Sequence, residues 1–181
     1  MFFLKDRFKN NVNIEIVNKA VSDNVGSSIF YEFSDGDAYN TLSEKWVDEL
    51  TAQDKFRDNV PTQNITSKTL VETVTIDSLV EHFGMPDYIK IDVEGHEKNV
   101  IDGMSIIPSM ISIECNLPIF VNESIFCIEK LSSLSEKYRF NFSISEPPEV
   151  LVLDEWCCCN TILEIVRSKK YQFMEIFAKL C

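Results

Sequence analysis

Apolar residues in this chain follow two spacings, which divide it into candidate strands and candidate helices. Runs rich in β-branched and aromatic residues predict strands over residues 13–21, 28–33, 69–76, 88–93, 111–115, 140–144, 150–153 and 161–166. Apolar residues spaced three or four positions apart predict helices over residues 2–10, 42–52, 123–138 and 169–180. Strands and helices alternate along most of the chain, which is typical of a parallel α/β sheet.

Turn and cap residues predict two further helices in the middle of the chain. Asp77 is placed to cap a helix that runs through Phe83, with Gly84 as its stop. A second helix is expected after Gly95. Its apolar residues expected to face the core are Val100, Ile101 and Met104.

Three other stretches complete the expected organisation. Residues 35–40 and 57–69 are polar and predict loops. Residues 140–144 alternate between apolar and polar side chains, so we expect a strand with one exposed face. No internal repeat occurs.

Composition agrees with one folded domain over residues 1–181. Hydrophobic residues make up 45% of the chain and charged residues 25%, as in ordinary globular proteins. A chain of 181 residues is also long enough to bury a substantial core.

Charge and targeting features limit the partners and the compartment. The formal net charge is -12, and the closest approach to a basic cluster is Arg167, Lys169 and Lys170, so we expect no nucleic-acid or membrane partner. No secretory signal opens the chain, since Lys5 and Asp6 follow the first four residues. No apolar run is long enough to span a bilayer. We therefore expect a cytoplasmic protein with reduced cysteines.

Acidic residues gather where the strand 88–93 is expected to end. Ligands of open parallel sheets bind beyond the carboxyl ends of the strands, and Asp92 and Glu94 stand at that position. Gly95 allows a sharp turn there, and Glu97 adds an acid to the first turn of the next helix. Two interpretations remain open from spacing alone: a site for a cationic cofactor, or carboxylates that only cap the helix.

A family resemblance favours the first interpretation. The stretch DYIKIDVEGHEKNVIDG, residues 87–103, resembles the signature of the FkbM-type methyltransferases. Weaker flanking motifs occur in the same order: NKAVSD at 18–23, NTL at 40–42, VTIDSL at 74–79 and ISIECN at 111–116. The resemblance implies a class I, Rossmann-like methyltransferase sheet with flanking helices. It also implies transfer of the methyl group of S-adenosyl-L-methionine to a hydroxyl oxygen, typically of a sugar or another small metabolite.

The resemblance also implies a cofactor side of the site. Ala20, Val21 and Ser22 would end the strand that borders the adenine, with Asp23 as a less certain contact. Asp92 would border the same cofactor close to the methyl group.

On the acceptor side, the resemblance implies roles for four residues. Asp92 and Glu94 would line the pocket around the methyl group and the acceptor, and Glu114 would face the acceptor from the next strand. For a general base, Asp92 is the first candidate and His96 the second, because an imidazole titrates near neutrality. The alternative for His96 is an exposed residue at the start of a helix.

One part of the family pattern is missing. The first strand-helix-strand unit, with its glycine-rich cofactor turn and ribose-binding acid, should precede residue 8, and such a unit needs roughly 30 residues or more. No Gly-x-Gly occurs anywhere in the chain. We therefore expect an N-terminally incomplete sheet. Three explanations stay open: a start placed too late, a degenerate remnant, or strands that close up directly on one another.

Two functions from different classes follow. The first is an O-methyltransferase acting on a small-molecule or glycan acceptor, and the second is a non-catalytic binding or assembly module with the same fold. A homo-oligomer is compatible with either. We expect no metal site, because Cys157, Cys158 and Cys159 are adjacent rather than spaced as zinc ligands.

Overall fold

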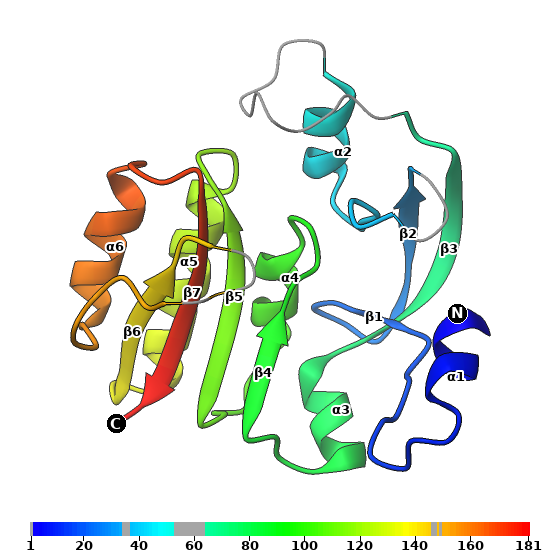
Figure 1. Cartoon of the computed structure of the whole chain (residues 1–181), viewed down its shortest axis with the longest axis horizontal. Helices are drawn as coiled ribbons and strands as arrows, with labels where there is room; N and C mark the ends of the chain where they lie inside the picture. The colour runs from blue at the N-terminus through cyan, green and yellow to red at the C-terminus, as the bar shows by residue number, and fades with distance from the viewer. Residues whose placement is uncertain (1, 34–36, 53–63, 146–147, 149) are drawn as a thin grey trace.

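The computed structural model describes residues 2–33, 37–52, 64–145, 148 and 150–181, and it contains two sheets (Figure 1). The strands are β1 (Ala20–Val21), β2 (Gly26–Glu32), β3 (Ser67–Val74), β4 (Tyr88–Ile91), β5 (Met110–Asn116), β6 (Tyr138–Ser143) and β7 (Phe173–Leu180). The helices are α1 (Phe2–Phe8), α2 (Glu44–Thr51), α3 (Ile76–Phe83), α4 (Glu97–Asp102), α5 (Val121–Leu134) and α6 (Cys159–Arg167). The architecture is mixed α/β and Rossmann-like.

The four-stranded sheet has the order β4-β5-β7-β6 and holds the larger core. β4 and β5 are parallel, whereas β7 runs antiparallel to both β5 and β6. One face of β5 carries Ile111, Ile113 and Cys115, and this face packs against α5 in the main hydrophobic cluster. The other face carries polar side chains, which include Ser112 and Glu114. The two faces of this sheet therefore have different chemistry.

The three-stranded sheet has the order β1-β3-β2 and carries a second, smaller cluster. β2 and β3 are antiparallel, and β1 pairs with the end of β3 in parallel. The N-cap residue of α2 is Ser43, whose side chain accepts a hydrogen bond from the Trp46 backbone amide. Trp46 and Leu50 pack with Tyr31 and Phe120 in this cluster. Because Phe120 precedes α5, this cluster joins the two sheets.

The prediction for the end of the chain was wrong in two places. Residues 161–166 lie in α6 and not in a strand, because Ile162, Leu163 and Val166 are buried along one helical face. Residues 173–180 form β7 and not a helix. β7 is the central strand between β5 and β6, so its residues 174–178 are buried on both faces and show no alternation.

Other strand predictions were too long or had the wrong exposure. Of the predicted strand 13–21, only Ala20 and Val21 pair with another strand. Residues 150–153 form no strand; the side chain of Asn141 instead hydrogen-bonds both the amide and the carbonyl of Leu153. β6 has no exposed face, since residues 140–143 are all buried.

The cap of α3 is also different from the prediction. Thr75 accepts a hydrogen bond from the Ser78 amide and forms a capping box with it. The Asp77 carboxylate instead accepts from the amide and the hydroxyl of Ser105, at 3.0 and 2.6 Å. The predicted loops at 35–36 and 57–63 lie outside the described residues.

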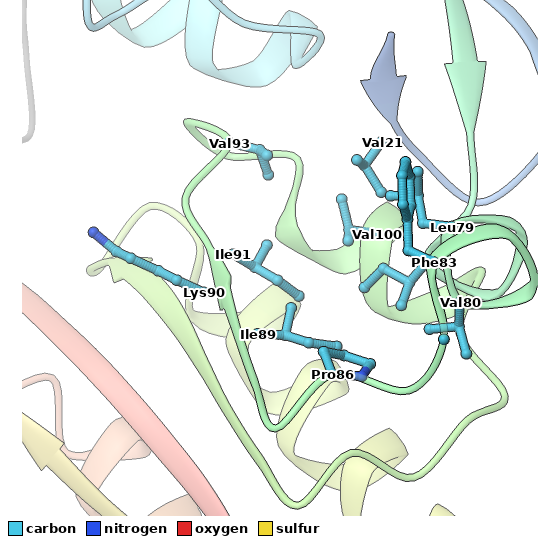
Figure 2. A pocket seen from close by; sticks show the side chains of 12 residues that line it. Val21, Leu79, Val80, Phe83, Pro86, Ile89, Lys90, Ile91, Val93 and Val100 are labelled. Atoms are coloured by element: carbon cyan, nitrogen blue, oxygen red, sulfur yellow. The ribbon is translucent and has the colours of Figure 1, made fainter. Parts of the chain in front are cut away.

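The outer edge of β4 faces an apolar cavity. Within the described residues, β5 is the only strand paired with β4, so β1 and β4 do not close up on one another. A cavity of about 320 Å³ lies along this edge, between β4, α3 and the end of β1. Its lining is almost entirely apolar, and Figure 2 shows Ile89, Ile91 and Val80 among the lining side chains.

Candidate functional site

A tight turn connects β4 to α4 and presents the acidic residues. Glu94 and Gly95 both have positive φ angles, 49° and 85°. A Cβ atom at residue 95 would lie 2.4 Å from the ring of Phe120, so only glycine fits there. Thr41, in the segment between β2 and α2, fixes the turn, because its hydroxyl donates to the Glu94 carbonyl at 2.7 Å.

Glu97 holds the same turn from inside. Its carboxylate accepts hydrogen bonds from the amides of Val93 and Gly95, at 3.3 and 3.2 Å. Burial raises the pKa of Glu97 to about 7, against the lowering effect of these backbone hydrogen bonds. The N-cap residue of α4 is His96, so Asp92 and Glu94 precede the helix and neither is its N-cap residue.

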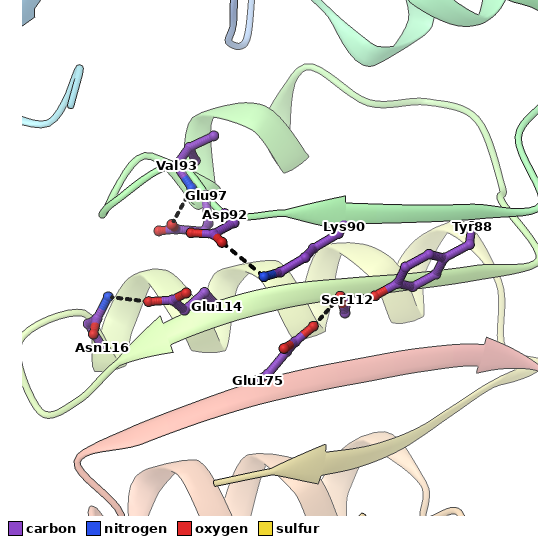
Figure 3. Close-up of polar contacts among 9 residues, drawn as sticks. All are labelled: Tyr88, Lys90, Asp92, Val93, Glu97, Ser112, Glu114, Asn116 and Glu175. Carbon is purple, nitrogen blue, oxygen red and sulfur yellow. Dashed lines mark hydrogen bonds and ion pairs between the residues drawn. The ribbon is translucent and has the colours of Figure 1, made fainter. Parts of the chain in front are cut away.

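Three carboxylates converge beside the turn. One carboxylate oxygen from each of Asp92, Glu94 and Glu114 lies within 4.8 Å of the other two. Asp92 forms an ion pair with Lys90 at 2.9 Å, and Glu114 accepts a hydrogen bond from the side-chain amide of Asn116 at 3.1 Å (Figure 3). Asp92 is exposed and Glu114 is buried, so the cluster runs from solvent into the polar face of the sheet. Such a cluster attracts a cation, whether a sulfonium or a divalent metal.

The polar face continues from this cluster toward β7. Ser112 donates to Glu175 at 2.7 Å and contacts the Tyr88 hydroxyl at 2.5 Å. Figure 3 shows these side chains on the same face of the sheet as Glu114. Buried acids on β5 and β7 therefore extend the negative region inward.

A second group of predicted residues lies at the end of β1. Ala20 and Val21 form this strand and are half-buried, and Val21 also lines the apolar cavity. The Ser22 amide donates to the Val74 carbonyl at 2.8 Å, which continues the pairing of β1 with β3. Asp23 follows at the surface.

His96 belongs to this second group. Its Nε2 lies 2.9 Å from the Ser22 hydroxyl, which in turn donates to the Asp23 carboxylate at 3.0 Å. Burial lowers the pKa of His96, although Asp23 acts in the opposite direction. The structure thus places Asp92, Glu94 and Glu114 together, and His96 with Ser22 and Asp23.

Several residues that build the site were not singled out from the sequence. Glu97 was noted only as a third acid, yet it holds the backbone of the turn. Gly103 allows close packing, because a Cβ there would lie 2.6 Å from the Cα of Asp23. The only sequence signal for Thr41 was its place in the weaker motif NTL.

Three of the flanking motifs thus reach the segment 92–96, through Thr41, Glu114 and Ser22. The comparison with protein families agrees with this arrangement. The profile of the Methyltransferase FkbM domain matches residues 4–142. The chain belongs to the FkbM methyltransferase family. The matched range ends within β6, so α6 and β7 lie outside it, although β7 pairs with β5 and β6 in the sheet of this FkbM domain. No curated protein and no solved structure matches the chain significantly.

Helix length gives one further observation. The longest described helix, α5, has 14 residues, and none of the described helices has the length and apolar character needed to cross a bilayer.

Proposed function

We propose that this chain is an S-adenosyl-L-methionine-dependent O-methyltransferase that acts on a hydroxyl group of a sugar or another small metabolite. The observation that carries the proposal is the convergence of Asp92, Glu94 and Glu114 at the carboxyl ends of β4 and β5. Ligands of such sheets bind at this edge, and the family is one of methyltransferases.

The residues fit two parts of the cofactor. The carboxylate cluster supplies negative charge for the sulfonium, and the exposed Asp23 supplies an acceptor for a hydroxyl or amine of the adenosyl group. None of the described segments provides a glycine-rich turn for the amino-acid part of the cofactor, and the sequence holds no Gly-x-Gly. The proposed contacts are therefore with the sulfonium and the adenosyl group of the cofactor.

The bound cofactor would supply the electrophilic methyl group, and the protein would position the acceptor. Asp92 is exposed and oriented by Lys90, so it is placed to accept the proton of the acceptor hydroxyl. Glu94 and Glu114 would accept hydrogen bonds from neighbouring hydroxyl groups, which a sugar or polyol offers. The same network raises the pKa of Lys90, chiefly through its hydrogen bond to Asp92.

Calorimetric titration with S-adenosylhomocysteine tests the cofactor assignment, and transfer of a labelled methyl group to a panel of sugars and hydroxylated metabolites tests the reaction. Asp92→Asn and Glu94→Gln should each lower transfer at least about tenfold. Asp102→Asn, at an exposed acid of α4, is the matched control and should leave transfer unchanged. Absence of saturable binding to the unmodified chain would overturn the cofactor assignment. If the unmodified chain binds S-adenosylhomocysteine and both Asp92→Asn and Glu94→Gln keep full transfer activity, the assignment of the site is overturned.

The free cysteines support a reducing compartment, and we propose the cytoplasm. All six cysteines are free, and Cys115 and Cys127 are buried. Burial raises the pKa of both thiols, which keeps them protonated and unreactive.

One observation favours a second candidate function, a non-catalytic assembly module. The outer edge of β4 presents backbone groups beside an apolar cavity, and such edges pair with strands of other chains. A second copy of this chain is the proposed occupant. Sedimentation would then show a dimer that Ile89→Lys dissociates, while Leu70→Lys, on the exposed side of β3, does not. A monomer at all concentrations would exclude this candidate.

A further inference from the structure

We propose that His96 is a positioning residue that orients the Asp23 carboxylate through Ser22 for the adenosyl group of the cofactor. The inference rests on the proposed function and deepens it. It moves His96 from the acceptor side, where it was a candidate base, to the cofactor side. The direction of two hydrogen bonds links His96 to Asp23.

The direction of this chain of hydrogen bonds follows from the donors available. The Ser22 hydroxyl has one proton, and it donates to Asp23 Oδ1 at 3.0 Å, because an ionised carboxylate only accepts. The Ser22 oxygen then accepts from its other neighbour, which is His96 Nε2 at 2.9 Å. We therefore assign the proton of the neutral imidazole to Nε2. The hydrogen-bond chain runs from His96 through Ser22 to Asp23.

The surroundings of Asp23 keep it ionised and leave one oxygen for a ligand. Oδ1 accepts from both Ser22 and Asn24, the latter at 2.8 Å, whereas Oδ2 has a long contact of 3.5 Å with the side-chain amide of Asn99. Burial acts to raise the pKa of Asp23, but hydrogen bonds from Ser22, from its own backbone amide, from Asn99 and from Asn24 outweigh it and lower the pKa overall. Oδ2 of this exposed residue is thus held in place to accept a hydrogen bond from a cofactor hydroxyl or amine.

Two members of this hydrogen-bond chain, Ser22 and His96, are attached to regular elements. Ser22 is fixed to β3 by its amide, and His96 is the N-cap residue of α4. Gly103, after α4, packs against the backbone of Ser22 and Asp23. Since α4 follows directly from the turn that carries Asp92 and Glu94, His96 connects the cofactor side of the site to the carboxylate cluster.

A ligand-free measurement tests the hydrogen-bond direction. The ring nitrogens of His96 can be assigned in a long-range ¹H–¹⁵N spectrum, and the other histidine, the exposed His82, serves as reference after comparison with His82→Asn. The expected result at neutral pH is a protonated Nε2 and an unprotonated Nδ1. The opposite tautomer would overturn the proposal.

A double-mutant cycle tests the effect on the cofactor. His96→Leu should raise the dissociation constant of S-adenosylhomocysteine about tenfold, and His96→Gln, whose amide can donate to Ser22, should recover most of the affinity. In the Asp23→Ala background, His96→Leu should have no further effect, because its influence passes through Asp23. Thermal unfolding of each variant confirms that it is folded.

The outcomes separate this inference from the proposed function. If the unmodified chain does not bind S-adenosylhomocysteine, the cofactor assignment fails, while the spectrum still decides the hydrogen-bond chain. If it binds and His96→Leu binds equally well, or if the effects of His96→Leu and Asp23→Ala are additive, the positioning role is wrong.

Discussion

The hydroxyl of Thr41 donates a hydrogen bond of 2.7 Å to the backbone carbonyl of Glu94, which follows it by 53 residues. The same hydroxyl accepts from the Ser43 amide at 2.8 Å, so one buried side chain joins the start of α2 to the turn after β4. This contact shows how the two sheets build a single site. It also gives the first prediction.

Thr41→Val should destabilise the fold by about 1–3 kcal/mol, because the isosteric side chain leaves the Glu94 carbonyl and the Ser43 amide without their partner. Thr41→Ser keeps the hydroxyl and should cost less. Urea unfolding of both variants measures the difference. Equal stability of Thr41→Val and the unmodified chain would show that the turn does not depend on Thr41.

Gly95→Ala should destabilise the fold more than Gly84→Ala does. Both residues have a positive φ angle, 85° and 90°, so both substitutions carry a backbone penalty of about 1–3 kcal/mol. At Gly84 nothing lies within 4 Å of the added Cβ, whereas at Gly95 the ring of Phe120 lies 2.4 Å away. Urea unfolding of Gly95→Ala with Phe120 present and in the Phe120→Ala background isolates the contact with Phe120. Equal effects of Gly95→Ala in the two backgrounds would mean that Phe120 moves aside without cost.

Glu94→Gly separates the folding role of the turn from its chemical role. Glu94 has a φ angle of 49°, where glycine is favoured by about 1 kcal/mol over other residues. The variant should be as stable as the unmodified chain or more stable, and it should lose methyl transfer because it lacks the carboxylate. Thermal unfolding and the transfer assay check both parts. A large loss of stability would show that the Glu94 side chain is structural.

Glu97→Gln should change the dependence of stability on pH. The pKa of Glu97 is about 7 in the folded chain and near 4.5 when unfolded. Between these pH values the carboxyl group of Glu97 keeps its proton in the folded state and has lost it in the unfolded state. The contribution of Glu97 to the free energy of unfolding is therefore full below about pH 4.5 and falls as the pH rises toward 7. The loss is about 3 kcal/mol for this group.

The neutral glutamine removes that loss, and its carbonyl can still accept from the amides of Val93 and Gly95. The stability of Glu97→Gln relative to the unmodified chain should therefore rise between pH 5 and pH 8 and level off above. Urea unfolding at several pH values measures this difference. A difference that does not change with pH would show that Glu97 is not held protonated by burial.

Local patterns were sufficient where one face of an element is buried or where a turn needs a particular residue. The spacing of Trp46 and Leu50 predicted α2, the apolar run at 28–33 predicted β2, and Gly95 indicated the turn after β4. The same patterns failed at β7 and α6. A strand buried on both faces has no period of two, and β-branched residues at helical spacing, such as Ile162 and Val166, have strand composition without strand geometry.

Residues 87–103 were enough to indicate the family and to place Asp92 and Glu94 at the end of a strand. Which of the predicted residues act together became clear from the tertiary structure. It brought Glu114 to the two acids and His96 to Ser22, and it placed Glu97 under the turn. The reason is physical: strand register and the packing of α4 fix these distances, and both depend on contacts between residues that are far apart in the chain.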